Sequence, residues 1–224
     1  MPCLTDPAPF AAEFFCARCR APFLNRAPLD DAGLCGVCRR GAPAFDAAYA
    51  YGFYDGTLAK LVRTYKYGRV QTLARPLGGL LSAALPRDEE FDVIAPMPLH
   101  WRKRWQRGFN QSELLARELA RRTGIPVRRA VKRVRFTNAQ AGLTGHQRRD
   151  NVSGAFRGIE GIARGKRVLL IDDVLTTGAT AAACARALKM SGAARVTILT
   201  LARADRRLDV MLFPRTATAS VGEF

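Results

Sequence analysis

The sequence lacks any apolar run of the roughly 20 residues that a bilayer-spanning helix needs, and its start lacks the charged-then-apolar pattern of an export signal. These absences predict a cytoplasmic protein without membrane insertion. Acidic residues are also scarce, because 19 stand against 36 Lys and Arg in 224 residues, for a net charge of +17. This charge favours polyanions or phosphorylated small molecules as partners, although a general bias toward Arg explains it equally well.

Internal repeats are lacking too, and changes in composition divide the chain into four segments. Residues 1–44 are rich in Cys, Pro and Arg with little periodicity, as expected of a small domain in which a metal replaces a hydrophobic core. Residues 45–90 are expected to form a helical connecting or hood segment, residues 91–205 the core domain and residues 206–224 a tail. The chain thus reads as one ordinary domain with a small appendage.

Hydrophobic periodicity predicts an α/β fold with a parallel sheet flanked by helices. Strands are expected at residues 47–53, 93–95, around Val131, and at 168–171 and 196–201. One helix follows Gly56, and its apolar face is made of Leu58, Leu61, Val62 and Tyr65, whereas Lys60, Arg63 and Lys66 point mostly elsewhere. A second helix starts near Pro76, and its apolar stripe is made of Leu77, Leu80, Leu81 and Leu85.

A third helix has well-marked ends. Asn110 and Glu113 are placed like a capping box, and Gly124 followed by Pro126 ends the helix. Residues 137–158 carry few apolar side chains and no clear period, so we expect a long loop there. Loops of that length in compact domains are usually functional lids or disordered.

The cysteines form two pairs with metal-site spacing. Cys16 and Cys19 are one CxxC pair, and Cys35 and Cys38 are a second, fifteen residues later. In a reducing compartment this arrangement predicts four thiolates around one structural zinc ion, with merely buried or redox-active cysteines as the alternative. Cys184 lies outside the pairs, where a small buried side chain is expected.

Arginines flank these cysteines and can offset the net double negative charge of a zinc ion with four thiolates. They are Arg18, Arg20, Arg39 and Arg40. The four arginines therefore need no nucleic acid to explain them.

Residues 168–180 carry the pattern most informative about function. A buried strand ends in Asp172 and Asp173, where carboxylates can accept hydrogen bonds from sugar hydroxyls. Hydroxyls and a turn follow at the start of an Ala-rich helix, whose N–H groups suit a phosphate dianion. The segment lacks both the Gly-Lys-Ser/Thr ending of the Walker loop and the three glycines of the dinucleotide fingerprint. We therefore expect a ribose 5-phosphate site, and the alternative is a turn with no ligand, which would leave two buried carboxylates repelling each other.

With these motifs the sequence resembles type I phosphoribosyltransferases, and specifically the ComF family of competence-associated phosphoribosyltransferase-like proteins. The resemblance covers nearly the whole chain. It is carried by the two CxxC pairs, residues 61–68 ending in Lys66-Tyr67-Gly68, residues 96–99, residues 107–111, Gln140, Leu143, Arg148, Asn151, Val152, residues 154–156 and residues 172–180. It does not extend past Arg203.

The resemblance implies that phosphoribosyl pyrophosphate binds with Mg²⁺. Asp172 and Asp173 would hold the ribose hydroxyls, and the 5-phosphate would lie in the loop made of Leu175, Thr176, Thr177, Gly178, Ala179 and Thr180. The loop at residues 98–111 would face the pyrophosphate, and a mobile loop at residues 138–156 would close over the substrate. The pyrophosphate and mobile-loop residues would be Lys66, Arg104, Arg107, Asn110, Gln111, Gln140, Arg148 and Asn151, with Arg107 and Arg148 in catalytic roles beside the two acids.

Two other functions fit the sequence. The loop could bind a nucleotide or sugar phosphate without turnover, since no residue is an obvious general base and His146 is a lone loop histidine. Alternatively, the segment at residues 100–107 could bind single-stranded DNA, because Trp101 and Trp105 interleave with four cations there. The two tryptophans are four residues apart, so they could equally form one packed helical face. The family's link to DNA uptake keeps DNA and competence proteins as possible partners.

Overall fold

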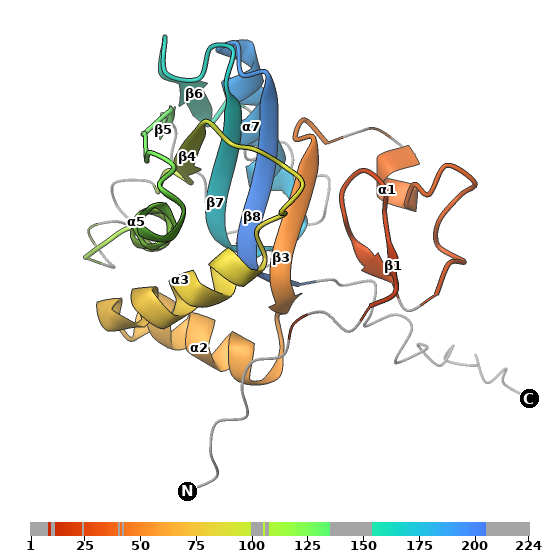
Figure 1. Ribbon diagram of the computed structural model, residues 1–224, viewed down its shortest axis with the longest axis horizontal. Helices are drawn as coiled ribbons and strands as arrows, with labels where there is room; N and C mark the ends of the chain where they lie inside the picture. The colour runs from red at the N-terminus through yellow and green to blue at the C-terminus, as the bar shows by residue number, and fades with distance from the viewer. Residues whose placement is uncertain are drawn as a thin grey trace, which may run out of the picture.

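In the computed structural model, parallel strands form a central sheet with helices on both faces (Figure 1). The structure describes residues 9, 12–23, 25–39, 41, 43–99, 105, 108–134 and 154–204. In chain order the elements are β1 (Phe14–Phe15), β2 (Pro22–Phe23), α1 (Gly36–Arg39), β3 (Ala47–Phe53), α2 (Gly56–Tyr67), the 3₁₀ helix η1 (Gln71–Leu73), α3 (Ala74–Ala83), β4 (Val93–Pro96), α5 (Gln111–Thr123), β5 (Val131–Arg133), β6 (Phe156–Gly158), β7 (Arg167–Leu175), α7 (Ala179–Met190) and β8 (Arg195–Arg203).

The main sheet has the strand order β3-β8-β7-β4, and each neighbouring pair is parallel. β7 and β8 lie in the middle, and their apolar residues are buried on both faces. Near the carboxyl ends of these strands, Asp172 is in register with Thr200, and Leu175 is in register with Arg203. The predicted α/β fold with a parallel sheet is therefore confirmed.

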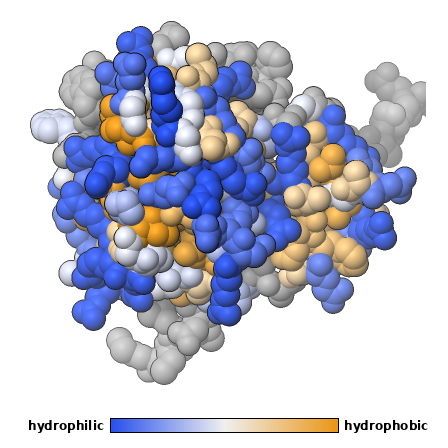
Figure 2. Space-filling view, turned by 45° about the horizontal axis from the view of Figure 1, so that its top comes forward, coloured by the Kyte–Doolittle hydropathy of each residue, from blue (hydrophilic) through white to orange (hydrophobic). Residues whose placement is uncertain are grey.

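Alternate residues of β7 face opposite layers of the molecule, as the period of a strand requires. Leu169 and Ile171 pack with the apolar stripes of α2, α3 and α5. Val168 and Leu170 pack on the other side with α7 and with the buried cysteines of the N-terminal segment. That segment carries β1 and α1 and lies beside the edge strand β3 (Figure 1). Figure 2 shows apolar side chains gathered on this small lobe, while hydrophilic side chains cover most of the rest of that face.

The predicted helix ends follow from local hydrogen bonding. The Asn110 side chain accepts a hydrogen bond from the Ser112 N–H at 3.2 Å, which caps α5 as predicted. Gly124 ends the same helix in the left-handed conformation, at φ 75°. The Glu113 carboxylate accepts hydrogen bonds from Arg117 and from Arg129, so it ties this helix to the chain beyond its end.

Two sequence predictions about strands are wrong. The strand around Val131 was expected in the parallel sheet, but β5 pairs antiparallel with β6 in a separate two-stranded sheet. The long loop expected at residues 137–158 does not include its last three residues, which form β6. Three-residue strands are too short to show a period, and β5 meets its partner only through long-range pairing. No helix in the described ranges has the length and apolar character to span a membrane.

The contact between α3 and α5 depends on Gly78, and this generates a test of the packing. A Cβ added at Gly78 would lie 2.5 Å from the Cβ of Glu118, whereas one added at Gly79 would meet only the Arg122 guanidinium at 3.5 Å. We expect Gly78→Ala to lower the free energy of unfolding by about 1–3 kcal/mol, because the two helices must move apart. The measurement is urea-induced unfolding followed by circular dichroism.

Gly79→Ala is the matched control, since it adds the same methyl group to the same helix. Alanine favours helix over glycine by about 0.5–1 kcal/mol, so this variant should be as stable as the parent or more stable. Equal destabilisation by the two substitutions would contradict the close approach at Gly78.

Candidate functional site

The candidate site lies where β7 passes into α7 at the carboxyl end of the sheet. β7 runs two residues beyond the acid pair, so Asp172 and Asp173 are the sixth and seventh residues of its nine. Gly178 caps the following helix with φ 74°, a left-handed conformation that favours glycine. Thr176 and Thr177 are exposed in the bend between strand and helix. The loop therefore offers two hydroxyls to solvent at the start of α7, and the Ala179 N–H donates to one of them, Thr177 Oγ1, at 3.4 Å. A helix N-terminus next to hydroxyls suits an anion.

The two carboxylates have separate partners from different helices. The Lys66 ammonium at the end of α2 lies 2.8 Å from Oδ1 of Asp173. The Ser112 hydroxyl in the first turn of α5 donates to Oδ1 of Asp172 at 3.1 Å. The backbone N–H of Asp173 also donates to this oxygen, at 2.9 Å. Both acids are thus engaged by the protein itself, with a cation at one and a hydroxyl at the other.

The Asp172 carboxyl is a much weaker acid than an ordinary aspartic acid. Burial raises its pKa to about 7, and the negative charge of Asp173 adds to the rise, while Lys66 and the hydrogen bonds from Asp173 N–H and Ser112 oppose it. This carboxyl therefore changes its charge near neutral pH. A group that titrates there is suited to exchange protons with a ligand or to change its hydrogen-bonding role when one binds.

A network of buried hydrogen bonds fixes the helix ends around the acids. The Tyr65 hydroxyl donates to the Gln111 carbonyl at 2.9 Å, and the Gln111 side chain donates to the Lys66 carbonyl at 3.4 Å. The Asn110 side chain donates to the Met97 carbonyl at 3.1 Å, just after β4. The ends of α2 and α5 are therefore joined to each other and to the sheet, so Lys66 and Ser112 are held in place.

The structure brings together part of the predicted residue set. Lys66, which was expected off the apolar stripe of its helix, pairs with Asp173. The Gln111 side chain donates to the Lys66 carbonyl, and Asn110 caps the neighbouring helix α5. Leu175 and Ala179 have buried side chains, so only their backbone can face a ligand, and Thr180 is half-buried. Other predicted site residues fall outside the described residues: Arg104, Arg107, Gln140, Arg148 and Asn151.

Sequence reasoning missed several side chains around the acids. Ser112 and Tyr65 carry polar atoms to the site, but at their positions the sequence shows only a helix start and an apolar stripe. Behind Asp172, the Arg133 guanidinium lies over the Phe156 ring at 5.4 Å, and burial lowers its pKa while the Asp172 charge raises it. Cys184 is buried as predicted, and burial raises its pKa. Arg133 stands at the end of a three-residue strand, and no spacing in the sequence marks it.

The four paired cysteines converge in the N-terminal lobe. Cys16, Cys19, Cys35 and Cys38 are buried, and their sulfur atoms lie within 4.8 Å of one another. Cys19 Sγ and Cys35 Sγ are 3.7 Å apart, close to the ~3.8 Å edge of a tetrahedron with metal–sulfur bonds of about 2.3 Å. The Cys35 N–H also donates to Cys16 Sγ at 3.3 Å. The donor set therefore fits a metal such as zinc.

Two of the clustered thiols have raised pKa values. A hydrogen bond with Cys35 and burial raise the pKa of Cys19 far above its usual value, and burial raises the pKa of Cys38 to about 12. Four adjacent thiolates would repel one another in a buried site, so a divalent cation is needed to stabilise the deprotonated form.

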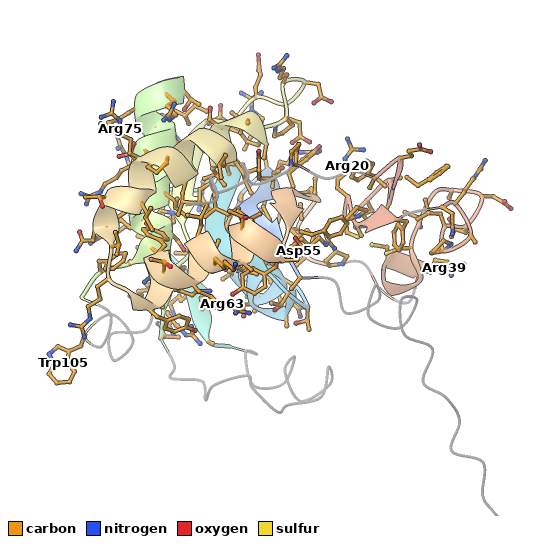
Figure 3. The ribbon with its side chains drawn as sticks, turned by 90° about the horizontal axis from the view of Figure 1, so that it is seen from below. Arg20, Arg39, Asp55, Arg63, Arg75 and Trp105 are labelled. Atoms are coloured by element: carbon orange, nitrogen blue, oxygen red, sulfur yellow. The ribbon has the colours of Figure 1, made fainter. Side chains whose placement is uncertain are left out.

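The surrounding arginines differ in how they meet the cluster. Arg18, Arg20 and Arg39 are exposed, and Arg20 lies over the ring of Tyr49 at 5.4 Å (Figure 3). Arg203, which sequence analysis did not single out, is buried and donates to the Cys19 carbonyl at 3.0 Å. A buried charge near the cluster thus comes from the far end of the chain.

Trp105 does not lie on a packed face. Its side chain is 85% exposed and projects away from the helices in Figure 3. The alternative of a packed helical face made by Trp101 and Trp105 is therefore wrong for Trp105, and Trp101 lies outside the described residues. An exposed indole is free to stack on another molecule.

Comparison with known proteins identifies a domain family and relatives of this chain. The phosphoribosyl transferase domain family matches residues 110–213. Competence protein F of Haemophilus influenzae is 34% identical over 184 residues, which span 76% of this chain and 78% of that protein. DNA utilization protein YhgH of Salmonella typhi is 35% identical, over 75% of this chain and 77% of that protein.

Among solved structures, a glutamine phosphoribosylpyrophosphate amidotransferase from Bacillus subtilis is 24% identical with a TM-score of 0.41. The match covers 58% of this chain and 26% of that chain. The extent and identity of the match to competence protein F, together with the domain match and the four-cysteine cluster, show that this chain belongs to the ComF/YhgH family of competence and DNA-utilization proteins with a phosphoribosyltransferase domain.

Proposed function

We propose that this chain is a cytoplasmic phosphoribosyltransferase that binds phosphoribosyl pyrophosphate, or a related ribose 5-phosphate, and acts in the use of imported DNA. The observation that carries the proposal is the placement of Asp172 and Asp173 near the end of β7, in the segment that leads into the N-terminus of α7, with the Lys66 ammonium 2.8 Å from Asp173. Acceptors for sugar hydroxyls and donors for a phosphate stand side by side there. The phosphoribosyltransferase domain match supports it.

In the proposed complex, Asp172 and Asp173 accept hydrogen bonds from the ribose hydroxyls. The amides at the start of α7 and the hydroxyls of Thr176 and Thr177 hold the 5-phosphate. Lys66 already pairs with an acid of the site, so its ammonium is within reach of a ligand anion once sugar hydroxyls share Asp173. The Asn110 and Gln111 hydrogen bonds keep the helix ends fixed around the sugar.

In the proposed reaction, a nucleophile displaces pyrophosphate from the sugar C1 through a cation-like transition state. Mg²⁺ bound with the substrate would neutralise part of the pyrophosphate charge. The protein's part is mainly electrostatic, and Arg104, Arg107 and Arg148 are the proposed donors to the departing pyrophosphate. The acceptor is left open, because no described residue selects one.

A second candidate function is single-stranded DNA binding without turnover, and the exposure of Trp105 favours it. An indole that is 85% exposed can stack on a base, and the chain's net charge of +17 attracts the phosphates of the DNA backbone. In this case the chain would be an accessory protein of the competence machinery.

The acid pair generates a binding test. We expect Asp172→Asn and Asp173→Asn each to weaken the binding of phosphoribosyl pyrophosphate with Mg²⁺ by about ten- to a hundredfold, because each removes a charged acceptor worth about 1.5–3 kcal/mol. The measurement is isothermal titration calorimetry on the full chain, after circular dichroism has shown that each variant is folded.

Asp55→Asn is the matched control, since it removes the same charge at an exposed position before α2 (Figure 3). It should leave sugar-phosphate affinity unchanged. Labelled single-stranded DNA, titrated over a salt series, should bind the acid variants as it binds the parent. Parent-like sugar-phosphate affinity in Asp173→Asn would contradict the proposed site. An equal loss of affinity for sugar phosphate and for DNA would show that the two sites are one.

The pKa of Asp172 generates a pH test. With its pKa raised to about 7, this carboxyl is mostly protonated at pH 6 and mostly ionised at pH 8, and the ionised form accepts stronger hydrogen bonds from hydroxyls. We therefore expect the affinity for ribose 5-phosphate to rise about tenfold from pH 6 to pH 8. The ligand phosphate also titrates near pH 6, so the Asp172→Asn variant should retain only that weaker dependence. Identical pH profiles in parent and variant would remove Asp172 from the site.

We further propose that the four-cysteine cluster holds one structural zinc ion. The sulfur positions fit a tetrahedral site, and the four ligands leave no open coordination position. We expect elemental analysis to find one zinc per chain, and Cys19→Ser to lose it. Cys184→Ser is the matched control, because Cys184 is equally buried but lies in α7 outside the cluster. A metal-free parent that folds normally would contradict a structural zinc.

A further inference from the structure

Arg203, the last residue of β8, joins the two ends of the described chain. Its side chain is buried, at 8% exposure, and turns toward the N-terminal lobe. One guanidinium nitrogen donates to the Cys19 carbonyl at 3.0 Å, and the other lies 3.9 Å from Cys19 Sγ. The contact spans 184 positions of the sequence. A cation is therefore held directly against one of the four clustered sulfurs.

Burying a guanidinium is costly unless an anion or a full set of acceptors compensates. Arg203 donates to a carbonyl oxygen and to a sulfur of Cys19, and a neutral thiol is a weak acceptor. Four thiolates with one divalent ion carry a net charge of about −2. The metal-loaded cluster therefore supplies the negative charge that makes a buried arginine at this position favourable.

The flanking arginines are less suited to this role. Arg18, Arg20 and Arg39 are close to the ligands in sequence but exposed, so water and salt screen their charges. Arg203 is buried, and its interaction with the sulfur is screened far less. The same burial fixes the direction of its N–H groups, because the guanidinium is a rigid planar fork.

We propose that Arg203 is the charge partner of the metal-loaded four-cysteine cluster and slows the loss of its metal. The guanidinium lies against the Cys19 sulfur, so its positive charge favours keeping this ligand on the metal. It also clamps the N-terminal lobe to the carboxyl end of the sheet. Arg203 is a positioning residue toward the metal, and this proposal does not depend on any sugar-phosphate function.

The backbone around Arg203 shows where the clamp acts. Arg203 is in register with Phe53 of β3 and with Leu175 of β7, which directly precedes the candidate phosphate loop. The Tyr54 N–H donates to the Arg203 carbonyl at 3.0 Å. Phe45, which follows the lobe, lies close to Gly178, since a Cβ there would be 3.8 Å from its ring. The lobe is thus fixed against the strand ends that carry the loop.

Metal release from the purified full chain tests the proposal. Zinc-loaded protein is mixed with an excess of a chromophoric chelator, and the rate of zinc transfer is followed. We expect Arg203→Gln to release zinc at least about tenfold faster than the parent, as losses of outer-shell partners usually do. Glutamine keeps a donor for the Cys19 carbonyl but lacks the charge. Arg203→Lys keeps the charge and should fall between the two.

Arg195→Gln is the matched control, because Arg195 begins the same strand, is exposed and pairs with Glu89. It should release zinc at the parent rate. A cobalt-substituted sample adds a second readout, since the sulfur-to-cobalt absorption band should shift in Arg203→Gln and not in Arg195→Gln.

A folded Arg203→Gln variant that releases zinc within twofold of the parent rate would overturn the proposal. Equal acceleration by Arg195→Gln would do the same, because it would show a general loss of stability. If Arg203→Gln does not fold, the decision passes to Arg203→Met, which is also uncharged and keeps a long side chain, so a parent-like rate in that folded variant overturns the proposal.

Discussion

Two adjacent carboxylates near the end of a buried strand are the constraint around which the rest of the site is organised. Two neighbouring carboxylates repel each other and lose hydration when they are buried, so each needs stabilising partners within the protein. Lys66 from α2 serves one and Ser112 from α5 serves the other. The hydrogen bonds of Tyr65 and Gln111 join the ends of these two helices beside the acids.

The sequence allowed much of this fold to be predicted, since its long elements have clear periods. β3 spans the predicted residues, and α5 starts and ends at the predicted cap residues. The cysteine spacing predicted the cluster of Cys16, Cys19, Cys35 and Cys38 that the structure shows. In these cases a local pattern encodes the result, whether it is a repeat, a cap or a pair of ligands with two residues between them.

What could not be predicted depends on contacts between distant segments. The pairing of β5 with β6, the hydroxyl of Ser112 at Asp172 and the guanidinium of Arg203 at Cys19 join residues 60 to 184 positions apart, or strands of only three residues. The helical period of α2 placed Lys66 off the apolar stripe, yet its long side chain reaches Asp173. Side-chain reach of this kind has no period, so hydropathy does not reveal it.

The strand order has a consequence for how the chain reaches its native state. β3 is the first strand of the main sheet to leave the ribosome, but its neighbour in the sheet is β8, which is the last. The edge strand therefore waits, unpaired, until about 150 further residues have been made, as the pairing of Ala47 with Thr197 shows. Such late pairing is slow and leaves a strand edge open during synthesis. A chain truncated before β8 would therefore lack the last strand and would also leave β3, the first strand of the main sheet, without its partner.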